Sequence, residues 1–202
     1  MSQNHGRQKR LAEQKKKRAE KARSKGSRPK LDEAAMLKRL VAEASAAPHG
    51  PTWISVGWDR VEDEPSLVTI VITRKLSGPY VLPMLALVDR TCLGVKDAMV
   101  ARPMTGPELE RFLQDLAEAH GGLVPVDLLV AQSVIFHAVD FAASLGFAPN
   151  PDYEPELLGP RPAVLLETAW AHPARPIYIP GPDDDAEAVQ ILLEAAGFGG
   201  AR

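Results

Sequence analysis

The sequence has a single cysteine and no apolar run long enough to span a membrane. Among its 202 residues Cys92 is the sole cysteine, so a disulfide within the chain is impossible, which is typical of a reducing compartment. No run of about 18 apolar residues occurs, so no transmembrane helix is predicted. No apolar stretch follows the basic N-terminal residues, so they do not indicate a secretory signal. We therefore expect a cytoplasmic protein without a membrane partner.

Motifs that hold metals or phosphate-bearing cofactors are also missing. No two histidines have the spacing of zinc ligands, and GFGG (residues 197–200) follows a predicted helix instead of opening one. The aspartates Asp183, Asp184 and Asp185 would point in different directions on a helix and lack the spacing of a calcium loop. Helix capping is the better interpretation of these aspartates, and no cofactor or resident metal is predicted.

The most informative feature is an uneven distribution of charge. Residues 1–30 contain twelve Lys or Arg and two Glu, a net charge of +10, so residues 31–202 carry −12 of the formal total of −2. Residues 1–30 are rich in helix-forming residues but have no apolar stripe that could pack on a core. We expect a disordered or fraying helical basic arm that ends in the linker SKGSRP, and a single globular domain over residues 31–202.

A basic arm of this kind predicts contact with a polyanion. Its cations would neutralise phosphates and release counterions, and the absence of aromatic residues argues against base reading. RNA or the ribosome is the favoured partner and DNA is the alternative; a solubility tail, an arm folded back on the acidic domain and a localisation signal compete with both. The candidate nucleic-acid-binding residues are Arg7, Lys9, Arg10, Lys15, Lys16, Lys17, Arg18, Lys21, Arg23 and Lys25.

The remaining sequence predicts an α+β fold. An amphipathic pattern predicts a first helix over residues 31–47, and β-branched and aromatic runs predict strands over 52–58, 66–75 and 80–89. Short connections between these runs indicate a three-stranded antiparallel meander. Packed helices are expected to follow over 106–122, 126–147 (a central buried helix), 150–159 and 183–199, with a further short strand over 175–180.

Three stretches resemble an uncharacterised bacterial protein family. They are LVDRTCLGVKDA (residues 87–98), FHAVDFAASLGFAPNPDY (136–153) and RPIYIPGPDDD (175–185). Members of that family pair LVD-x-x-CLGVKDA with A-x-x-LGF-x-P-x-x-DY and a P-x-YI-x-GP-x-D ending, and basic N-termini are also common among them. The similarity spans residues 53–195 and implies a shared fold. The family has no established activity, so the resemblance implies no catalytic residue.

Two groups of side chains are candidates for chemistry. Asp89, Lys96 and Asp97 follow a predicted strand, where carboxylates can take a metal and a lysine can take a phosphate oxygen. In the structural alternative, Asp89 caps a turn, Gly94 supplies a positive φ and Asp97 pairs with a local cation.

The second group is a cysteine and a histidine. Cys92 with His137 would form a thiolate–imidazole pair that Asp140 could orient. The alternative is a buried apolar thiol and a hydrogen-bonded structural histidine.

Two functions follow from these features. The first is a noncatalytic nucleic-acid-associated protein that contacts RNA or ribosome phosphates through the basic arm. The alternative is a small metal-dependent hydrolase or nuclease that uses Asp89, Lys96 and Asp97. Convergence of these residues and His137 in one open cleft would favour the enzyme. The sequence specifies no oligomeric state.

Overall fold

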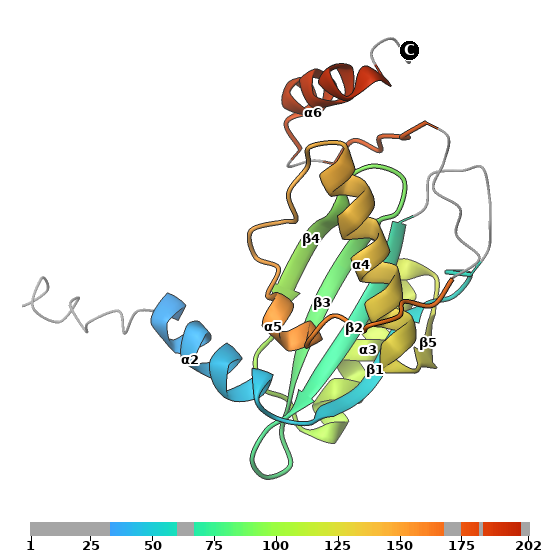
Figure 1. The fold of residues 1–202 in the computed structure, drawn as a ribbon. Helices are drawn as coiled ribbons and strands as arrows, with labels where there is room; N and C mark the ends of the chain where they lie inside the picture. The colour runs from blue at the N-terminus through green and yellow to red at the C-terminus, as the bar shows by residue number, and fades with distance from the viewer. Residues whose placement is uncertain (1–32, 60–66, 168–174, 182–183, 199–202) are drawn as a thin grey trace, which may run out of the picture. The chain divides into compact units, whose positions relative to one another are not determined.

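The computed structural model describes residues 33–59, 67–167, 175–181 and 184–198 (Figure 1). The predicted basic arm, with its ten candidate cations, lies outside the described residues. The chain divides into two units, Met1–Leu40 and Val41–Arg202. The division falls inside helix α2 (Glu33–Ser45), whose Val41 and Ala44 are buried.

The larger unit is built on a five-stranded antiparallel sheet, which confirms the α+β fold class. The strands are β1 (His49–Ser55), β2 (Leu67–Lys75), β3 (Val81–Asp89), β4 (Gly94–Val100) and β5 (Leu123–Val126), in the order β4-β3-β2-β1-β5. Strands β1 to β3 form the predicted meander. Ile54, Ile70, Ala86 and Ala98 lie directly opposite one another on successive strands, and all four are buried. Such cross-strand rows stabilise a sheet through packing on a common face.

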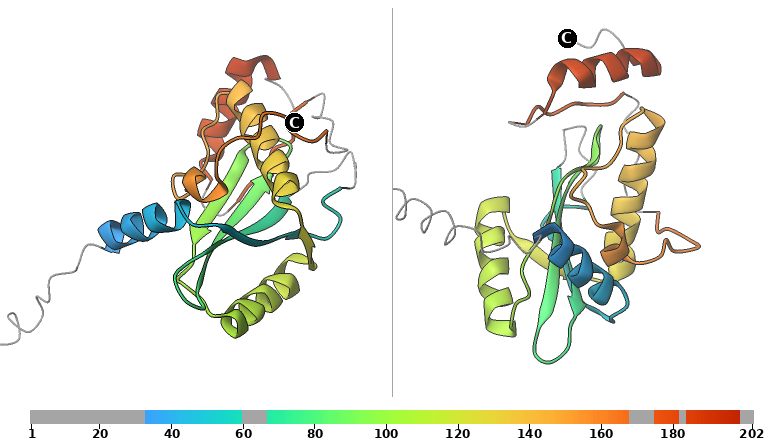
Figure 2. Two further views of the ribbon diagram at one scale, coloured as in Figure 1. Left: turned by 60° about the horizontal axis from the view of Figure 1, so that its bottom comes forward. Right: turned by 90° about the vertical axis from the view of Figure 1, so that its left-hand side faces the viewer.

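The helices cover both faces of the sheet. Helix α4 (Leu128–Ser144) lies on one face and α3 (Gly106–His120) on the other, as the right-hand view of Figure 2 shows. The short helix α5 (Pro155–Leu158) and helix α6 (Ala186–Leu193) follow, and after α6 the chain kinks within η1 (Glu194–Phe198), where Gly197 has a φ of 90°. None of the helices in these described ranges is long and apolar enough to cross a membrane.

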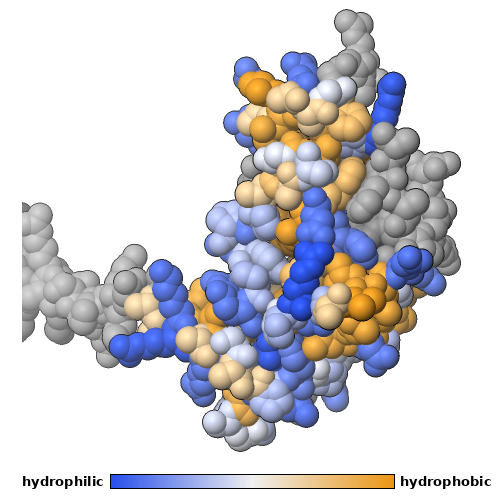
Figure 3. Space-filling model, viewed as in Figure 1, coloured by the Kyte–Doolittle hydropathy of each residue, from blue (hydrophilic) through white to orange (hydrophobic). Residues whose placement is uncertain are grey.

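Hydrophobic and hydrophilic residues are interleaved on the side of the molecule seen in Figure 1. Hydrophobic residues gather over α6, at the top of the space-filling view (Figure 3). Ile191 of this helix is 59% exposed, whereas Val189 and Leu193 are buried. Helix α6 is therefore amphipathic, with one apolar face packed and a single large apolar side chain left outside.

One expectation about the elements was wrong, and two strands had not been predicted. Strand β4 has the sequence GVKDAMV, in which Gly, Lys and Asp have low strand propensity, and pairing with β3 overrides that propensity. Strand β5 occupies the four residues before α4 and contains a proline, which an edge strand tolerates. Residues 175–180, predicted as a strand, are irregular, and the Ile177 amide donates to the Thr91 carbonyl at 3.0 Å.

Helix α4 was predicted to be a central buried helix, but only one side of it is buried. Its buried residues include Ala131, Val134, Ile135, Ala138 and Ala142, whereas Asp140 on the same helix is exposed. The helix approaches β4 closely at Gly94, which has a φ of 70°. A Cβ atom there would lie 2.8 Å from the Ala142 Cβ. Glycine is thus required at this position for its positive φ and for the close packing of α4.

A buried arginine joins three segments beneath the sheet. Arg74 on β2 is 5% exposed, and its guanidinium donates to the carbonyl oxygens of Leu157 at 2.8 Å, Ala47 at 2.8 Å and Glu156 at 3.1 Å. Burial lowers the pKa of Arg74 from its ordinary value. The three carbonyls belong to Ala47, just after α2, and to α5, so this side chain holds both segments against the end of β2.

We expect replacement of Arg74 to destabilise the fold strongly. The substitution Arg74→Met keeps the apolar bulk but leaves three carbonyl oxygens without their donor, at a cost of about 1–3 kcal/mol for each group that stays buried. Removal of the buried charge offsets part of this cost, so a net loss of about 2–4 kcal/mol in the free energy of unfolding is expected. Chemical denaturation measures it. The neighbouring exposed Lys75→Met should change stability by less than about 0.5 kcal/mol, and equal losses in the two variants would contradict the role of Arg74.

Candidate functional site

Asp89 serves the turn between β3 and β4. Its side chain is fully buried, and Oδ1 accepts hydrogen bonds from the Thr91 amide at 2.9 Å, the Thr91 hydroxyl at 2.9 Å and the Cys92 amide at 3.0 Å. Burial raises the pKa of Asp89, and these hydrogen bonds oppose the rise. The geometry is that of an Asp side chain that closes a turn through its own backbone.

Lys96 lies at an irregularity in the pairing of β4. The register passes from Val88 opposite Val95 to Leu87 opposite Asp97, so Lys96 has no partner residue across the ladder. Its Nζ is 2.7 Å from Asp184 Oδ2, donates to the Ile179 carbonyl, and lies 5.6 Å from the centre of the Tyr178 ring. A β-bulge redirects side chains locally, and here the extra residue reaches the segment that precedes α6.

The carboxylate of Asp184 collects several donors. Besides Lys96, its Oδ2 accepts hydrogen bonds from the Gly181 amide at 2.7 Å and the Tyr178 hydroxyl at 3.1 Å. We call Lys96, Tyr178, Gly181 and Asp184 the C-terminal latch. Burial acts to raise the pKa of Asp184, but the hydrogen bonds from Lys96, Gly181 and Tyr178 outweigh it and hold that pKa below its ordinary value. The latch therefore contains an ionised carboxylate at neutral pH.

Tyr178 of the latch packs against the apolar cluster that contains Cys92. Cys92 is fully buried in a cluster with Leu145, Val189 and Leu193, against which Tyr178 and Phe198 also pack. Burial, with a smaller contribution from nearby Asp89, raises the pKa of the Cys92 thiol to about 12. A thiol with this pKa is neutral at physiological pH and is a poor nucleophile. The environment is that of a small apolar side chain in a core.

His137 and Asp97 lie in other surroundings. His137 on α4 has Nε2 3.1 Å from the carbonyl oxygen of Leu166, and Asp140 receives two hydrogen bonds from Arg161, at 2.8 and 2.5 Å. Asp97 is exposed on β4, and its Oδ1 accepts from the Ala98 amide at 2.8 Å.

The structure brings together a different set of residues from the one expected. The turn unites Asp89 with Cys92, and the latch unites Lys96 with Asp184, whereas His137 and Asp97 each have partners of their own. Among the described residues there is no group of three or more His, Cys, Asp or Glu side chains placed to hold a metal ion. Asp185 accepts from the Ala188 amide at the start of α6, the helix-capping role expected for the aspartates, whereas Asp184 binds Lys96.

Sequence reasoning missed the latch because its partners are far apart in the chain. Lys96 and Asp184 are separated by 88 residues, and neither belongs to a motif that points to the other. No family model, no curated protein and no solved structure matches the chain. The site is therefore interpreted from its own geometry.

We expect the latch to protect Cys92 from thiol reagents. The substitution Asp184→Asn removes the anionic partner of a lysine whose side chain is 9% exposed. A loss of about 1.4 kcal/mol in the closure of the C-terminal segment would raise the rate of Cys92 labelling about tenfold. Labelling of the full-length protein with a dithiodipyridine reagent under native conditions measures this rate. Asp97→Asn changes the charge by the same amount at an exposed site and should leave the rate unchanged; a rate raised equally in both variants would refute the latch.

The latch also predicts a pH dependence. Because the pKa of Asp184 is lower in the folded protein than in the unfolded chain, its contribution to stability is complete above the unfolded value of about 4. That contribution is lost as the pH falls through the lower folded pKa. Unfolding midpoints of the native protein and of Asp184→Asn should therefore converge as the pH is lowered below about 4. A difference between the two proteins that stays constant from pH 7 to pH 2 would exclude an ionised Asp184 in the latch.

Proposed function

We propose that this protein is a noncatalytic, nucleic-acid-associated protein of the cytoplasm that contacts RNA phosphates, such as those of the ribosome, through its basic N-terminal arm. The observation that carries the proposal is the segregation of charge, +10 in residues 1–30 against −12 in the remaining chain. Twelve cations in a thirty-residue segment without an apolar stripe suit a phosphate backbone better than a folded protein core.

The internal use of cations in the larger unit supports this proposal. Arg74 binds three carbonyls, Arg90 donates to the Trp58 carbonyl, and Lys96 binds Asp184. On the surface, Arg102 pairs with Glu108 at 2.8 Å and Arg161 with Asp140. Much of the positive charge of this unit is therefore bound within the protein, so the arm is the richest source of cations for a partner.

The acidic character of the rest of the chain restricts how RNA can approach. A net charge of −12 repels a phosphate backbone over distances of about one Debye length, so the arm has to lead the contact. Binding through such an arm is nonspecific in sequence and strongly dependent on salt.

The alternative function, a metal-dependent hydrolase or nuclease, gains no support from the described contacts. Oδ1 of Asp89 is occupied by three donors from its own turn, and Lys96 is held by Asp184 and the Ile179 carbonyl. A lysine so engaged is poorly placed to take a phosphate oxygen.

Matched charge variants of the full-length protein test the proposal. Replacement of Lys15, Lys16 and Lys17 by Gln removes three arm cations, and replacement of Lys75, Arg111 and Arg175, all exposed, removes three from the larger unit. Binding to a labelled single-stranded RNA is measured by fluorescence anisotropy over a series of salt concentrations. We expect the arm variant to reduce the slope of log K against log salt by about 2, because each phosphate contact contributes about 0.7.

The second triple variant is the control, because it has the same net charge as the arm variant. It should retain a slope close to that of the native protein. Equal losses in both variants would show that net charge, and not the arm, governs binding. Absence of RNA binding by the native protein at low salt would contradict the proposal. It would favour the interpretation of residues 1–30 as a solubility tail.

A further inference from the structure

A histidine lies directly beside the buried guanidinium of Arg74. His49 is the first residue of β1, and it is paired with Arg74 in the ladder between β1 and β2. A Cβ atom added to Gly159 would lie 3.0 Å from His49 Nε2 and 3.1 Å from Arg74 Nη2. Both side chains therefore reach the same point of the segment that follows α5. We call Ala47, His49, Arg74 and α5 the Arg74 junction.

The imidazole ring is poorly supplied with hydrogen-bond partners. Its Nδ1 is buried and has no partner within the described residues, and the side chain as a whole is half-buried. A neutral imidazole can leave Nδ1 without a hydrogen, whereas both nitrogens of an imidazolium are donors. Uptake of a proton at His49 would therefore bury a charged N–H group that lacks an acceptor.

The charges near the ring also oppose its protonation. Burial, and to a smaller extent the charge of Arg74, lowers the pKa of His49 from its ordinary value. No carboxylate of the described residues lies within ion-pair distance of the ring. Like charges that face each other across a ladder are destabilising, so an imidazolium would repel the guanidinium. The other titratable side chains on the elements packed here are exposed or half-buried: Glu43 of α2, Lys75 of β2, and Tyr153, Glu154, Glu156 and Arg161 around α5.

The backbone that follows His49 is fixed, so the ring itself has to respond to a charge. Gly50 lies so close to β2 that a Cβ atom there would overlap the Thr73 hydroxyl, and this hydroxyl donates to the Pro51 carbonyl at 2.7 Å. The regular ladder resumes at Thr52, after an irregularity in register. Movement of the His49 ring toward solvent would therefore leave the ladder from Thr52 onward intact.

We propose that His49 makes the Arg74 junction sensitive to acid. While the imidazole is neutral, Arg74 holds α5 and the residues just after α2 against the end of β2. When the imidazole takes up a proton, repulsion between the two cations weakens these contacts, and α5 opens locally from the sheet. This conformational device is independent of the RNA-binding arm, and neither proposal depends on the other.

The pH range of the device follows from the direction of the shift. The folded protein binds a proton at His49 less readily than the unfolded chain, so the contribution of the neutral ring to stability is complete above the unfolded pKa of 6.5. That contribution is lost as the pH falls from this value toward the lower folded pKa. The range lies above the one expected for Asp184, which begins below about pH 4, so the two effects are separable.

Hydrogen exchange of the full-length protein, followed by mass spectrometry at about pH 7.5 and about pH 4.5, tests the proposal. The informative peptides cover residues 46–50 and 153–160. After correction for the intrinsic dependence of exchange on pH, we expect both peptides of the native protein to lose protection several-fold at the lower pH. The amides of β3, which is paired on both sides, should keep their protection, because the opening is local.

Variants assign the effect to His49. His49→Gln keeps a polar side chain that takes up no proton, so both peptides should be equally protected at the two pH values. His120→Gln removes an exposed imidazole at the end of α3 and should behave as the native protein does. An equal loss of protection in the native protein and in His49→Gln would overturn the proposal, because another group would then sense the proton. A native protein whose α5 stays protected at the lower pH would overturn it as well.

Thermal unfolding at neutral pH establishes that each variant is folded. If His49→Gln does not fold, His49→Phe takes its place, because an apolar ring suits a site in which Nδ1 has no partner. The native protein supplies a measurement that needs no variant: an NMR titration of the His49 ring. Its inflection should lie below the ordinary histidine pKa of about 6.5. An inflection at or above that value would overturn the proposal.

Discussion

The arrangement of the larger unit depends on a buried guanidinium. Arg74 lies at the end of β2, and its guanidinium donates to the carbonyl oxygen of Ala47, just after α2, and to those of Glu156 and Leu157 in α5. Burial of an arginine is costly unless its donors are satisfied, and three carbonyl oxygens in well-defined positions satisfy them here. The same contacts hold α5, so a single side chain couples the sheet to the segment that follows α4.

A second set of polar contacts attaches the C-terminal segment to the sheet. The latch fixes the C-terminal segment to β4 through a lysine at a bulge, and the apolar cluster around Cys92 lies beneath this segment. Edge strands leave backbone groups unpaired, and β4 uses the bulge together with hydrogen bonds from Asn150 to occupy some of them. Residues 94–98, which include the candidate site residues Lys96 and Asp97, therefore belong to the strand that forms this edge of the sheet.

Positive charge has two separate uses in this protein. In the larger unit, cations such as Arg74, Arg90 and Lys96 bind internal oxygens and contribute to the fold. In residues 1–30 the cations are too many and too close together to be balanced locally by two glutamates. A protein organised in this way can be acidic overall and still present a basic arm to a polyanion, and net charge alone would hide that capacity.

Local patterns in the sequence determined the strands β2 and β3, the helix α3 and the α+β class. These elements were predictable because β-branched runs, a proline near a helix start and a glycine at its end act within a few residues. Asp89 as a turn cap and the positive φ of Gly94 were also foreseen, for the same reason.

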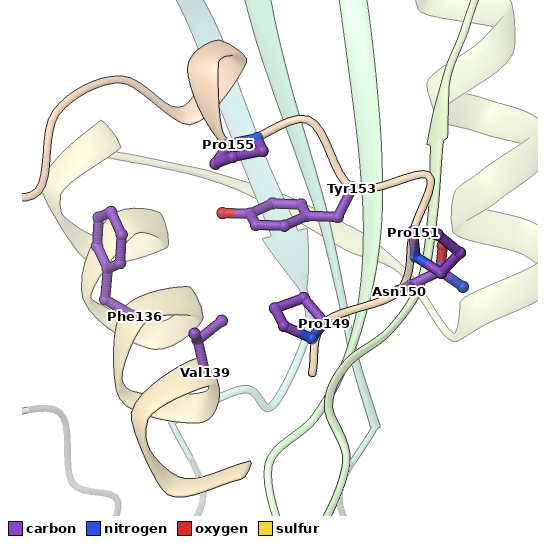
Figure 4. A pocket seen from close by; sticks show the side chains of 7 residues that line it. All are labelled: Phe136, Val139, Pro149, Asn150, Pro151, Tyr153 and Pro155. Atoms are coloured by element: carbon purple, nitrogen blue, oxygen red, sulfur yellow. The ribbon is translucent and has the colours of Figure 1, made fainter. Parts of the chain in front are cut away.

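Only the tertiary structure decided that GVKDAMV is a strand, that Lys96 binds Asp184, and that Phe136 and Tyr153 line the same pocket (Figure 4). Each of these features joins residues that are distant in the chain, and their free energy arises from pairing and burial that no local pattern encodes.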